Sequence, residues 1–555
     1  MSLFLTEPEK SRLAELRKTS AVANGLFWAL QNRVTRRAST PNLHDDTTST
    51  DWWYHVAEYL SDAAMAYAFS RSQAVGSWLR STTLAIARRP VDDWVGPEFR
   101  DHSGDQPRGH LETAHLGWGI ALVLDLAGEV FSPSEKDEVS EALRDKGIAL
   151  CLRWLEDAPG LSNWRCVLNA GVALPSAILG DEAALKKVRE EYSRGLDLFQ
   201  PDGSYSESLQ YGNYAAYAQM LIWETLSRKG EEPPSFLPYA RMPRWQAASL
   251  LYRKPLAGGN GYPVARSVNF NDSAAIFRPS ADLLLHIACR ARHALPVEAG
   301  LARWLFDTLY TPVINHGPHD LASFGLVNDF GFLSLTLLPE AAAPISPEEA
   351  GLPLMAAFSC GDLIVRNEWK GKTTLAIRGG SDPLHAPGHL HGDLNSFILV
   401  HNEERLLADP GHSCYRNLIR GLDVSSRAHN TCTFSLGDRT LEQTTAFRRR
   451  WNPQTGQTDD PIDRGARRLA LERLDDVTVI GSDAAAAYGE PLKTFRRYWF
   501  LCGEHVVFIV DRIESEEPIR TTWNWMLNNR DQQLEVKTFL PDRLVVRPVI
   551  KPTRA

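Results

Sequence analysis

GHLHGDLNSFILVHNEERLLADPGHSCYRNLIRGLDVSSRAHNTCTF, from Gly388 to Phe434, is the stretch that decides the fold of the second half of this chain. Its middle alternates polar and apolar residues like a β-strand and breaks at Asp409-Pro410-Gly411, a turn sequence. His389, His391 and Asp393 are two residues apart, so an extended strand would project all three from one face. Asp409 ends the next strand-like run, and His429 opens another.

Two imidazoles and a carboxylate from adjacent strands are the ligand types that a zinc-like divalent ion prefers. We therefore take His391, Asp409 and His429 as candidate metal ligands. The spacing also allows a plainer interpretation, because the chain has no HExxH or CxxC pattern. In that interpretation the histidines are hydrogen-bonded core residues and Asp-Pro-Gly is only a turn.

The overall composition is typical of a soluble globular protein. Of the 555 residues, 43% are hydrophobic and 23% are charged, and the net charge is −8. This mild acidity argues against a nucleic-acid binder. Seven scattered cysteines without CxxC spacing do not form a disulfide framework. No apolar stretch is long enough to span a membrane, and the N-terminus does not look like a signal peptide. We expect a cytoplasmic protein, or a periplasmic one if a leader has been removed.

The hydrophobic period changes once along the chain. Apolar residues recur at helical spacing from about residue 7 to residue 339, and short segments rich in Pro, Gly and Asp separate the predicted helices. Short β-rich runs follow, including 358–369, which we interpret as sheet scaffold. The order predicts an α+β chain of two domains, with an antiparallel α/α array in residues 1–345 and an antiparallel β-sandwich in residues 346–555.

Two stretches of the helical half carry candidate functional residues. LSNWRCVLNAG (161–171) runs from a loop into a helix, and Ser162 or Asn163 stands where an N-cap belongs. PDGSYSESLQYGNY (201–214) runs from a turn into a helix that carries Tyr211 and Tyr214 one turn apart. Capping, core packing of the tyrosines and a favourable first-turn carboxylate at Glu207 are the structural alternatives to a functional role.

The run GHLHGDLNSF, followed by LLADPG, a tyrosine (Tyr415) and RAHNT, resembles the C-terminal domain of the heparinase II/III-like polysaccharide lyases. The resemblance implies a structural metal, usually zinc, at His391, Asp409 and His429, and leaves His389 facing the substrate. It also implies that the helical array is an (α/α) toroid.

The resemblance extends to both stretches of the helical half. It implies that Asn163 binds the substrate carboxylate and that Tyr211 serves as acid and base, with Tyr214 as the alternative tyrosine. Many relatives have a histidine where this chain has Trp164. We assign further substrate contacts to Arg165, Trp164, Glu207, Tyr214 and Tyr415.

The implied activity is β-elimination on a uronate-containing glycan, either alginate or a glycosaminoglycan, with exo action on imported oligosaccharides. The expected partner is an anionic oligo- or polysaccharide, and neither a nucleic acid nor a membrane is expected. For the oligomeric state, a homodimer stays open. Two other functions stay open. One is an α/α-toroid glycoside hydrolase that uses two carboxylates among Glu112, Asp202, Glu207 and Asp272. The other is a non-catalytic glycan-binding protein.

Overall fold

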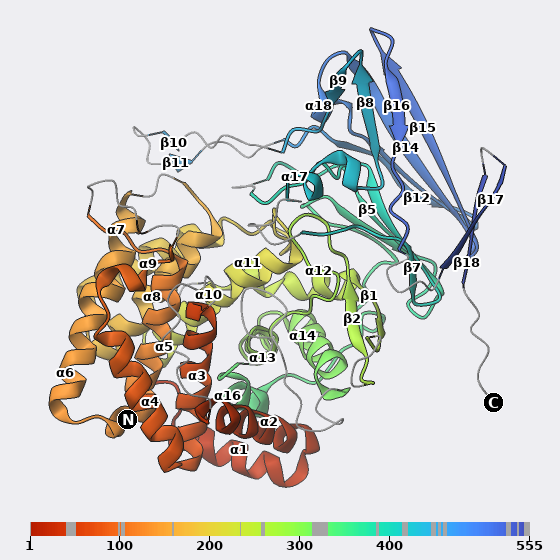
Figure 1. Cartoon of the computed structure of the whole chain (residues 1–555). Coiled ribbons are helices and arrows are strands. Elements are labelled where there is room, and N and C mark those ends of the chain that lie inside the picture. Colours follow the sequence, from red (N-terminus) through yellow and green to blue (C-terminus); the bar gives the residue numbers. More distant parts are fainter. Residues whose placement is uncertain are drawn as a thin grey trace.

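Helices fill the first half of the chain and antiparallel strands fill the second half (Figure 1). The computed structural model describes residues 2–39, 52–97, 100, 106–157, 160–232, 235–256, 261–312, 331–384, 388–412, 420–445, 451–452, 457–458, 463–528, 534–540 and 543–548. Among the helices in these ranges, none has the length and apolar character needed to cross a bilayer.

The main helices of the first half are α1 (Glu7–Thr19), α2 (Ala21–Ala38), α3 (Trp52–Ser70), α4 (Gln73–Ala87), η1 (Val91–Trp94), α5 (Leu111–Ala127), η3 (Gly128–Val130), α6 (Pro133–Ala142), η4 (Leu143–Ile148), α7 (Ala149–Asp157), α8 (Asn163–Leu179), α9 (Glu182–Leu196), α10 (Leu209–Arg228), α11 (Leu237–Ala240), α12 (Met242–Ser249), α13 (Ala281–Arg290), α14 (Pro296–Leu309), α16 (Ser334–Leu337) and η5 (Leu338–Glu340). Several begin at polar caps. Thr6 and Ser132 form capping boxes, and the Ser208 hydroxyl accepts from the amide of Tyr211 at the start of α10.

The helices α5, α8 and α10 begin at the same end of the helical half. The ring of His110, at the N-terminus of α5, lies 5.6 Å from the ring of Trp164, at the N-terminus of α8. Farther along, a Cβ on Gly171 of α8 would lie 2.5 Å from the Cα of Ala114 of α5, so only glycine allows this close crossing. The helices α8 and α10 run in the same direction, because α9 returns the chain between them.

A hairpin interrupts the helical half, which the hydrophobic period does not predict. The strands β1 (Leu250–Lys254) and β2 (Val264–Ser267) pair antiparallel directly after α12. The turn that follows β2 leads the chain towards the second half, and its contacts are described with the candidate site below.

The second half consists of antiparallel sheets. Its strands are β3 (Met355–Ala357), β4 (Asp362–Arg366), β5 (Thr373–Arg378), β6 (Ser396–His401), β7 (Glu404–Leu407), β8 (Cys432–Leu436), β9 (Arg439–Leu441), β10 (Trp451–Asn452), β11 (Gln457–Thr458), β12 (Arg467–Leu474), β13 (Val477–Asp483), β14 (Leu492–Cys502), β15 (Val506–Ser515), β16 (Arg520–Trp523), β17 (Leu534–Leu540) and β18 (Arg543–Pro548), with short helices α17 (Arg420–Asp423), η6 (Ser426–Ala428) and α18 (Ala485–Tyr488). The larger sheets have the orders β3-β4-β5-β6-β7, β12-β13-β14-β15 and β16-β8-β9.

One apolar cluster joins the two largest sheets. It contains Leu363, Ile377 and Phe397 from the five-stranded sheet and Ile480 and Trp499 from the four-stranded sheet. The prediction of an α+β chain with antiparallel sheets is confirmed. Closure of the helices into a toroid, the sandwich architecture and the boundary at residues 345 and 346 stay predictions.

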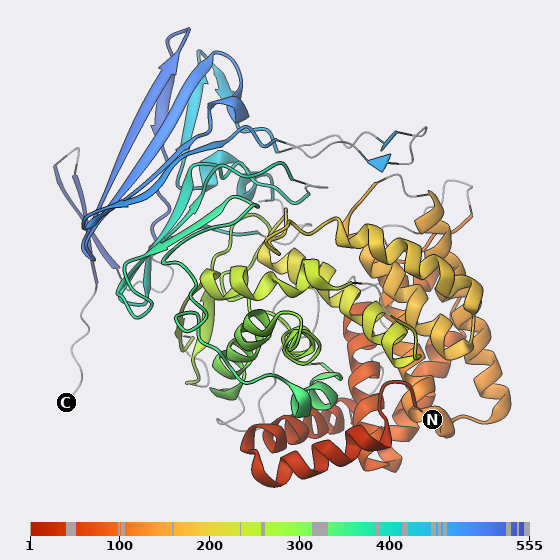
Figure 2. The same ribbon diagram turned by 180° about the vertical axis from the view of Figure 1, so that it is seen from behind.

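The sheets lie beside α11 and α12 and away from α1 and α2, as both views show (Figure 1 and Figure 2). A buried polar contact fixes this junction. Trp245 of α12 donates from Nε1 to Asp362 Oδ2 at 2.9 Å, and Asp362 Oδ1 accepts from Arg378 at 2.6 Å. The three side chains are at most 4% exposed, so the two halves share part of their core.

Candidate active site

The candidate site is a cluster of three side chains from both halves of the chain. The imidazole of His389 stacks on the ring of Tyr211, with centroids 3.8 Å apart and planes 13° apart. His389 Nδ1 donates to Glu207 Oε2 at 2.9 Å, which leaves Nε2 as the second polar atom of the ring. Glu207 is buried, whereas the His389 side chain is 26% exposed. Only the histidine of this trio presents substantial surface to a ligand.

The local backbone at His389 differs from the sequence prediction. His389, His391 and Asp393 do not share a face of a strand, because β6 begins only at Ser396. His389 has a φ of +53°, a left-handed conformation that few residues other than glycine adopt. This conformation breaks the strand alternation, so the prediction of one polar face was wrong. His429 likewise precedes its strand, since β8 begins at Cys432.

A turn of the helical half connects the two sides of the cluster, and we call residues 269–273 the bridging turn. Asn271 donates from Nδ2 to the Glu207 carbonyl and accepts from the His391 amide at 2.9 Å. Asp272 accepts from the Ser208 hydroxyl through its carbonyl at 2.8 Å. The bridging turn therefore holds the start of α10 and the loop before β6 in a fixed relation. In the sequence analysis Asp272 was only one of four carboxylates considered for a hydrolase. No pattern in the sequence indicated a role for Asn269 or Asn271.

Asn163 lies in the first turn of α8, at the end of the helical half where α5 and α10 also begin. Ser162 occupies the N-cap position without a side-chain cap hydrogen bond, so capping does not explain this stretch. Both amide atoms of Asn163 are buried and have no hydrogen-bond partner in the described part of the chain. A buried amide without a partner is costly, and a polar ligand would relieve the cost.

Tyr214 has a partner inside the helical half. Its hydroxyl lies 2.8 Å from His115 Nε2, and both residues are almost fully buried. Burial lowers the pKa of His115 well below its ordinary value, so this imidazole is neutral at pH 7. The structure therefore gives Tyr214 a structural contact, while Tyr211 lies against the exposed histidine.

The other predicted substrate contacts are placed differently. The guanidinium of Arg165 is buried and forms an ion pair with Glu191 of α9, and its contact with substrate stays a prediction. Trp164 stacks on Trp154 with ring centroids 5.9 Å apart, so its ring belongs to an aromatic cluster at this end of the helices. Tyr415 lies outside the described residues.

The predicted metal ligands lie close together. Each of the two histidines is hydrogen-bonded to an aspartate, and one of these aspartates is the predicted ligand Asp409. His391 Nε2 donates to Asp272 Oδ1 and His429 Nδ1 donates to Asp409 Oδ2, each at 2.8 Å. The two imidazole centroids are 5.3 Å apart. Gly411 also donates its amide to Asp409 Oδ1 at 2.9 Å.

The donor types in these pairs fit a zinc-like ion. His391 Nδ1 and His429 Nε2 are buried without a hydrogen-bond partner within the described ranges. A histidine that donates one ring N–H to a carboxylate and keeps its other nitrogen for a metal is the usual arrangement at zinc sites. However, no three His, Cys, Asp or Glu side chains of the described residues converge as a metal site requires. The metal stays a prediction.

The comparison with protein families agrees with this geometry. Residues 350–541 match the family model described as "Heparinase II/III-like, C-terminal". This part of the chain is a heparinase II/III-like C-terminal domain. The resemblance predicted from the sequence is thereby confirmed, and the heparinase II/III-like domain is the half that contributes His389, His391, Asp409 and His429 to the site. No curated protein matches the sequence.

Solved structures extend the similarity over both halves. A heparinase III has a TM-score of 0.55 at 13% identity, covering 96% of this chain and 82% of that chain. Another heparinase III, the BT4657 gene product, has a TM-score of 0.54 at 14% identity, covering 92% and 74%. A mutant of the heparan sulfate lyase HepC from Pedobacter heparinus has a TM-score of 0.52 at 12% identity, covering 86% and 65%. At these identities the similarity shows the fold of the whole chain, including the helical half that precedes the heparinase II/III-like domain.

Proposed function

We propose that this protein is a polysaccharide lyase that cleaves uronate-containing chains by β-elimination. The observation that carries the proposal is the Tyr211–His389–Glu207 cluster, in which a phenol stacks on a partly exposed imidazole across the two halves of the chain. The heparinase fold of the whole chain supports it. Alginate and glycosaminoglycans are the proposed substrate classes, with exo action on oligosaccharides.

The reaction begins at the C5 proton of the uronate, which is α to the carboxylate. Removing it builds up enolate-like charge, and positioned donors lower the barrier by stabilising that charge. His389 can donate or share a proton at Nε2, and the unpartnered amide of Asn163 offers a further donor. The N-terminal ends of α5, α8 and α10 add partial positive charge at the same end of the helices. Asn163 is 1% exposed, so its contact with substrate requires the side chains that cover it to move.

Tyr211 is the proposed proton-transfer residue. A phenolate at this position would take the C5 proton, and the phenol so formed would return a proton to the 4-linked oxygen as the glycosidic bond breaks. The products are an unsaturated uronate and a chain with a free hydroxyl. An imidazolium at His389 would favour the phenolate through its charge, since the two rings are stacked.

The hydrolase alternative needs two carboxylates that are available to the glycosidic bond and to water. Three of the four carboxylates considered for it are engaged elsewhere. Glu207 accepts from His389, Asp272 accepts from His391, and Asp202 accepts from the Ser359 amide at 2.6 Å. The structure thus favours elimination over hydrolysis.

The direct test is the near-ultraviolet absorbance of a C4–C5 double bond conjugated to a carboxylate. Purified protein is incubated with alginate, hyaluronan, chondroitin and heparan oligosaccharides of defined length. A rise with one substrate supports the lyase and names its polymer. Reducing sugar released without absorbance would show hydrolysis, and binding without either product would show a glycan-binding protein.

Glu207 is proposed to position His389 rather than to contact substrate. Glu207→Gln removes the carboxylate that receives the His389 Nδ1 proton but keeps the side-chain volume. Because partners that orient a functional residue typically contribute 10–100-fold, we expect kcat to fall by about that factor with KM little changed. The acidic limb of the pH–rate profile should move as well, since the imidazole loses its anionic neighbour. An unchanged kcat and pH profile would refute the positioning role.

We also propose that His391, Asp409 and His429 hold one structural divalent ion, zinc by preference. Such an ion would anchor the loop that carries His389, while the proton transfers stay with the chain's own residues. Elemental analysis of protein purified without chelators should find about one equivalent of metal, and His429→Ala should lose it. His401→Ala, at a histidine in β6 that bonds Thr373, is the matched control. Equal metal content in all three proteins, or none in any, would contradict the assignment.

A further inference from the structure

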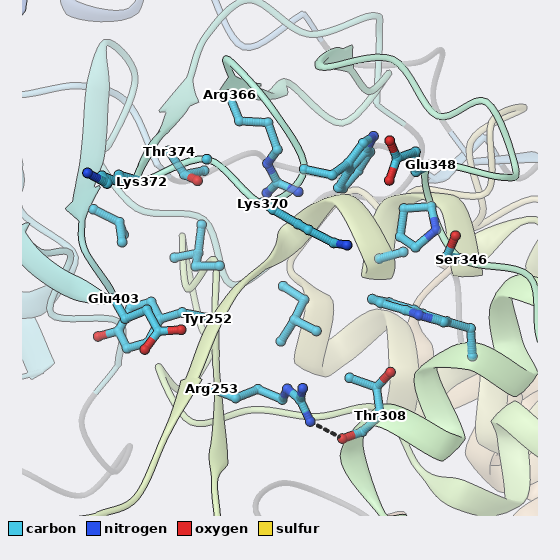
Figure 3. A pocket seen from close by; sticks show the side chains of 18 of the residues that line it. Tyr252, Arg253, Thr308, Ser346, Glu348, Arg366, Lys370, Lys372, Thr374 and Glu403 are labelled. Atoms are coloured by element: carbon cyan, nitrogen blue, oxygen red, sulfur yellow. Dashed lines mark hydrogen bonds between the residues drawn. The ribbon is translucent and has the colours of Figure 1, made fainter. Parts of the chain in front are cut away.

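A cavity lies at the junction of the two halves. It has a volume of about 830 Å³, within the usual range for small-molecule sites, and it shares no lining residue with the Tyr211–His389–Glu207 cluster. Its walls come from β1, α14, the segment 346–349, the turn between β4 and β5, and the turn after β6 (Figure 3). We call it the junction pocket.

The deepest charge in the junction pocket is Arg366, the last residue of β4. Its side chain is 7% exposed, yet it forms no ion pair with any described carboxylate. One Nη donates to the Ala248 carbonyl at 2.8 Å, the guanidinium lies 4.6 Å from the Trp369 ring centroid, and Nε has no partner in the described residues. Burial lowers the pKa of Arg366 to about 10.

This arrangement differs from that of three other buried arginines, whereas Arg405 resembles Arg366 in bonding only neutral acceptors, Asn269 Oδ1 and the Ser267 carbonyl. Arg33, Arg378 and Arg497 each lie within 2.7 Å of a carboxylate oxygen, on Asp62, Asp362 and Asp511 respectively. Buried charges are normally paired because an isolated charge is costly to remove from water. Arg366, unlike Arg405, lines a cavity, so its missing counter-ion is expected from outside the chain.

Three further cations line the junction pocket, and all three are exposed: Arg253, Lys370 and Lys372. No ion pair joins any of them to a carboxylate within the described ranges, and Arg253 donates instead to the Thr308 carbonyl at 2.7 Å. Figure 3 shows Arg366 and Lys370 reaching towards the middle of the lining.

Three carboxylates also line the junction pocket. Glu349 accepts from the amide and the hydroxyl of Ser346, at 2.9 and 2.8 Å, so it is already engaged. Glu348 and Glu403 lie on opposite sides of the drawn lining (Figure 3). The centre of the pocket is therefore cationic, with acidic groups at its margins.

Aromatic rings complete the lining. Tyr252, Trp304 and Trp369 are all half-buried around the same cavity. Flat rings with one apolar face pack against the C–H faces of sugars, and their polar edges tolerate water. A ligand that matches both the cationic centre and the aromatic rings is a short chain of sugar rings that carries carboxylates or sulfates.

We propose that the junction pocket binds a short acidic oligosaccharide at a place separate from the candidate active site. The anionic groups pair with Arg366 and Lys370, and the sugar rings pack on the tryptophans. This inference rests on the residues of the pocket and does not require the protein to be a lyase.

The test uses the full chain carrying Tyr211→Phe, so that a substrate is not consumed. Lysine acetylation is followed by peptide mass spectrometry with and without alginate, hyaluronan, chondroitin or heparan tetrasaccharides, and with cellotetraose as the neutral control. At least one acidic tetrasaccharide should protect Lys370 and Lys372, and added salt should reduce the protection. Lys493, an exposed lysine of β14, should stay reactive throughout. Absence of protection with every acidic tetrasaccharide, or equal protection by cellotetraose, would reject the proposal.

Variants then locate the site by calorimetry. Lys370→Glu, at the exposed opening, and Arg366→Met, in the interior, should each weaken binding at this site by about tenfold or more, whereas Lys493→Glu should not. Retained affinity in both folded pocket variants would also overturn the assignment. In the wild-type background, Lys370→Glu should keep its turnover of a short oligosaccharide. In the unmutated protein, absence of turnover together with protection of Lys370 would count against the lyase alone, and turnover without that protection would count against the pocket alone.

Discussion

Replacing Tyr211 with phenylalanine is expected to lower kcat on the uronate oligosaccharide that the protein cleaves by about 10²–10⁴-fold, with a small change in KM. The substitution removes one oxygen atom and keeps the ring that stacks on His389 at 3.8 Å. Binding and folding are therefore preserved, while the group that moves the proton is lost. The measurement is the initial rate of ultraviolet absorbance at saturating substrate.

Two other tyrosines sharpen this experiment. Tyr192→Phe is the matched control, because the Tyr192 hydroxyl does not belong to the cluster and instead donates to the Ser235 carbonyl at 3.3 Å and bonds Tyr239. Tyr214→Phe tests the alternative assignment and should mainly reduce stability, since it leaves His115 Nε2 without its partner. A loss of kcat in Tyr214→Phe together with normal turnover in Tyr211→Phe would reverse the assignment.

The largest expected effect on stability comes from Asp362→Ala. This carboxylate is 3% exposed and binds both Arg378 of the sheet and Trp245 of the helical half. Its removal leaves a buried guanidinium without its closest counter-ion, a change that typically costs about 3–5 kcal/mol. The midpoint of urea unfolding should fall accordingly, and the unfolding of the two halves should become less coupled, as judged by helical and β-sheet circular dichroism signals.

An exposed ion pair provides the comparison. Glu138 pairs with Arg88 at 2.8 Å on the surface of the helical half, where both side chains are solvated. Glu138→Ala should cost about 0–1 kcal/mol. The loss of stability in Asp362→Asn should lie between those of Asp362→Ala and Glu138→Ala, because the asparagine keeps an acceptor for Trp245 and loses only the charge. A loss of less than 1 kcal/mol in Asp362→Ala would contradict the role given to this junction.

The sequence allowed the α+β order to be predicted, whereas the expected grouping of the histidines on one strand face was wrong. The change from helical to strand period appears when successive windows are compared, and it matches the observed order, in which η5 ends at Glu340 and β3 begins at Met355. The grouping of Tyr211 with His389 came from resemblance, because no local pattern relates residues that are far apart in the chain. The pairing of His429 with Asp409 likewise depends on long-range packing.

Other features could not be predicted, because they depend on contacts between residues that are far apart in the sequence. The cap expected at Ser162 is not formed, and Asn163 is left with an unpartnered amide. Arg165 looked available for substrate but is neutralised by Glu191 in the next helix. The stretch 358–369 was interpreted only as scaffold. It does contain β4, and yet Arg366 and Trp369 at its end line a cavity that exists only when both halves are assembled.

The bridging turn restricts how such a protein can be recombined. Asn271 bonds the carbonyl of Glu207 on one side and the amide of His391 on the other. A chimaera that takes its sheets from one parent and its helices from another keeps the contact between Asn271 and Glu207 but divides the contact between Asn271 and His391. Grafts that move residues 269–273 together with the sheets divide the contact with Glu207 instead. A working interface should therefore need Asn271 and both of its partners from one parent.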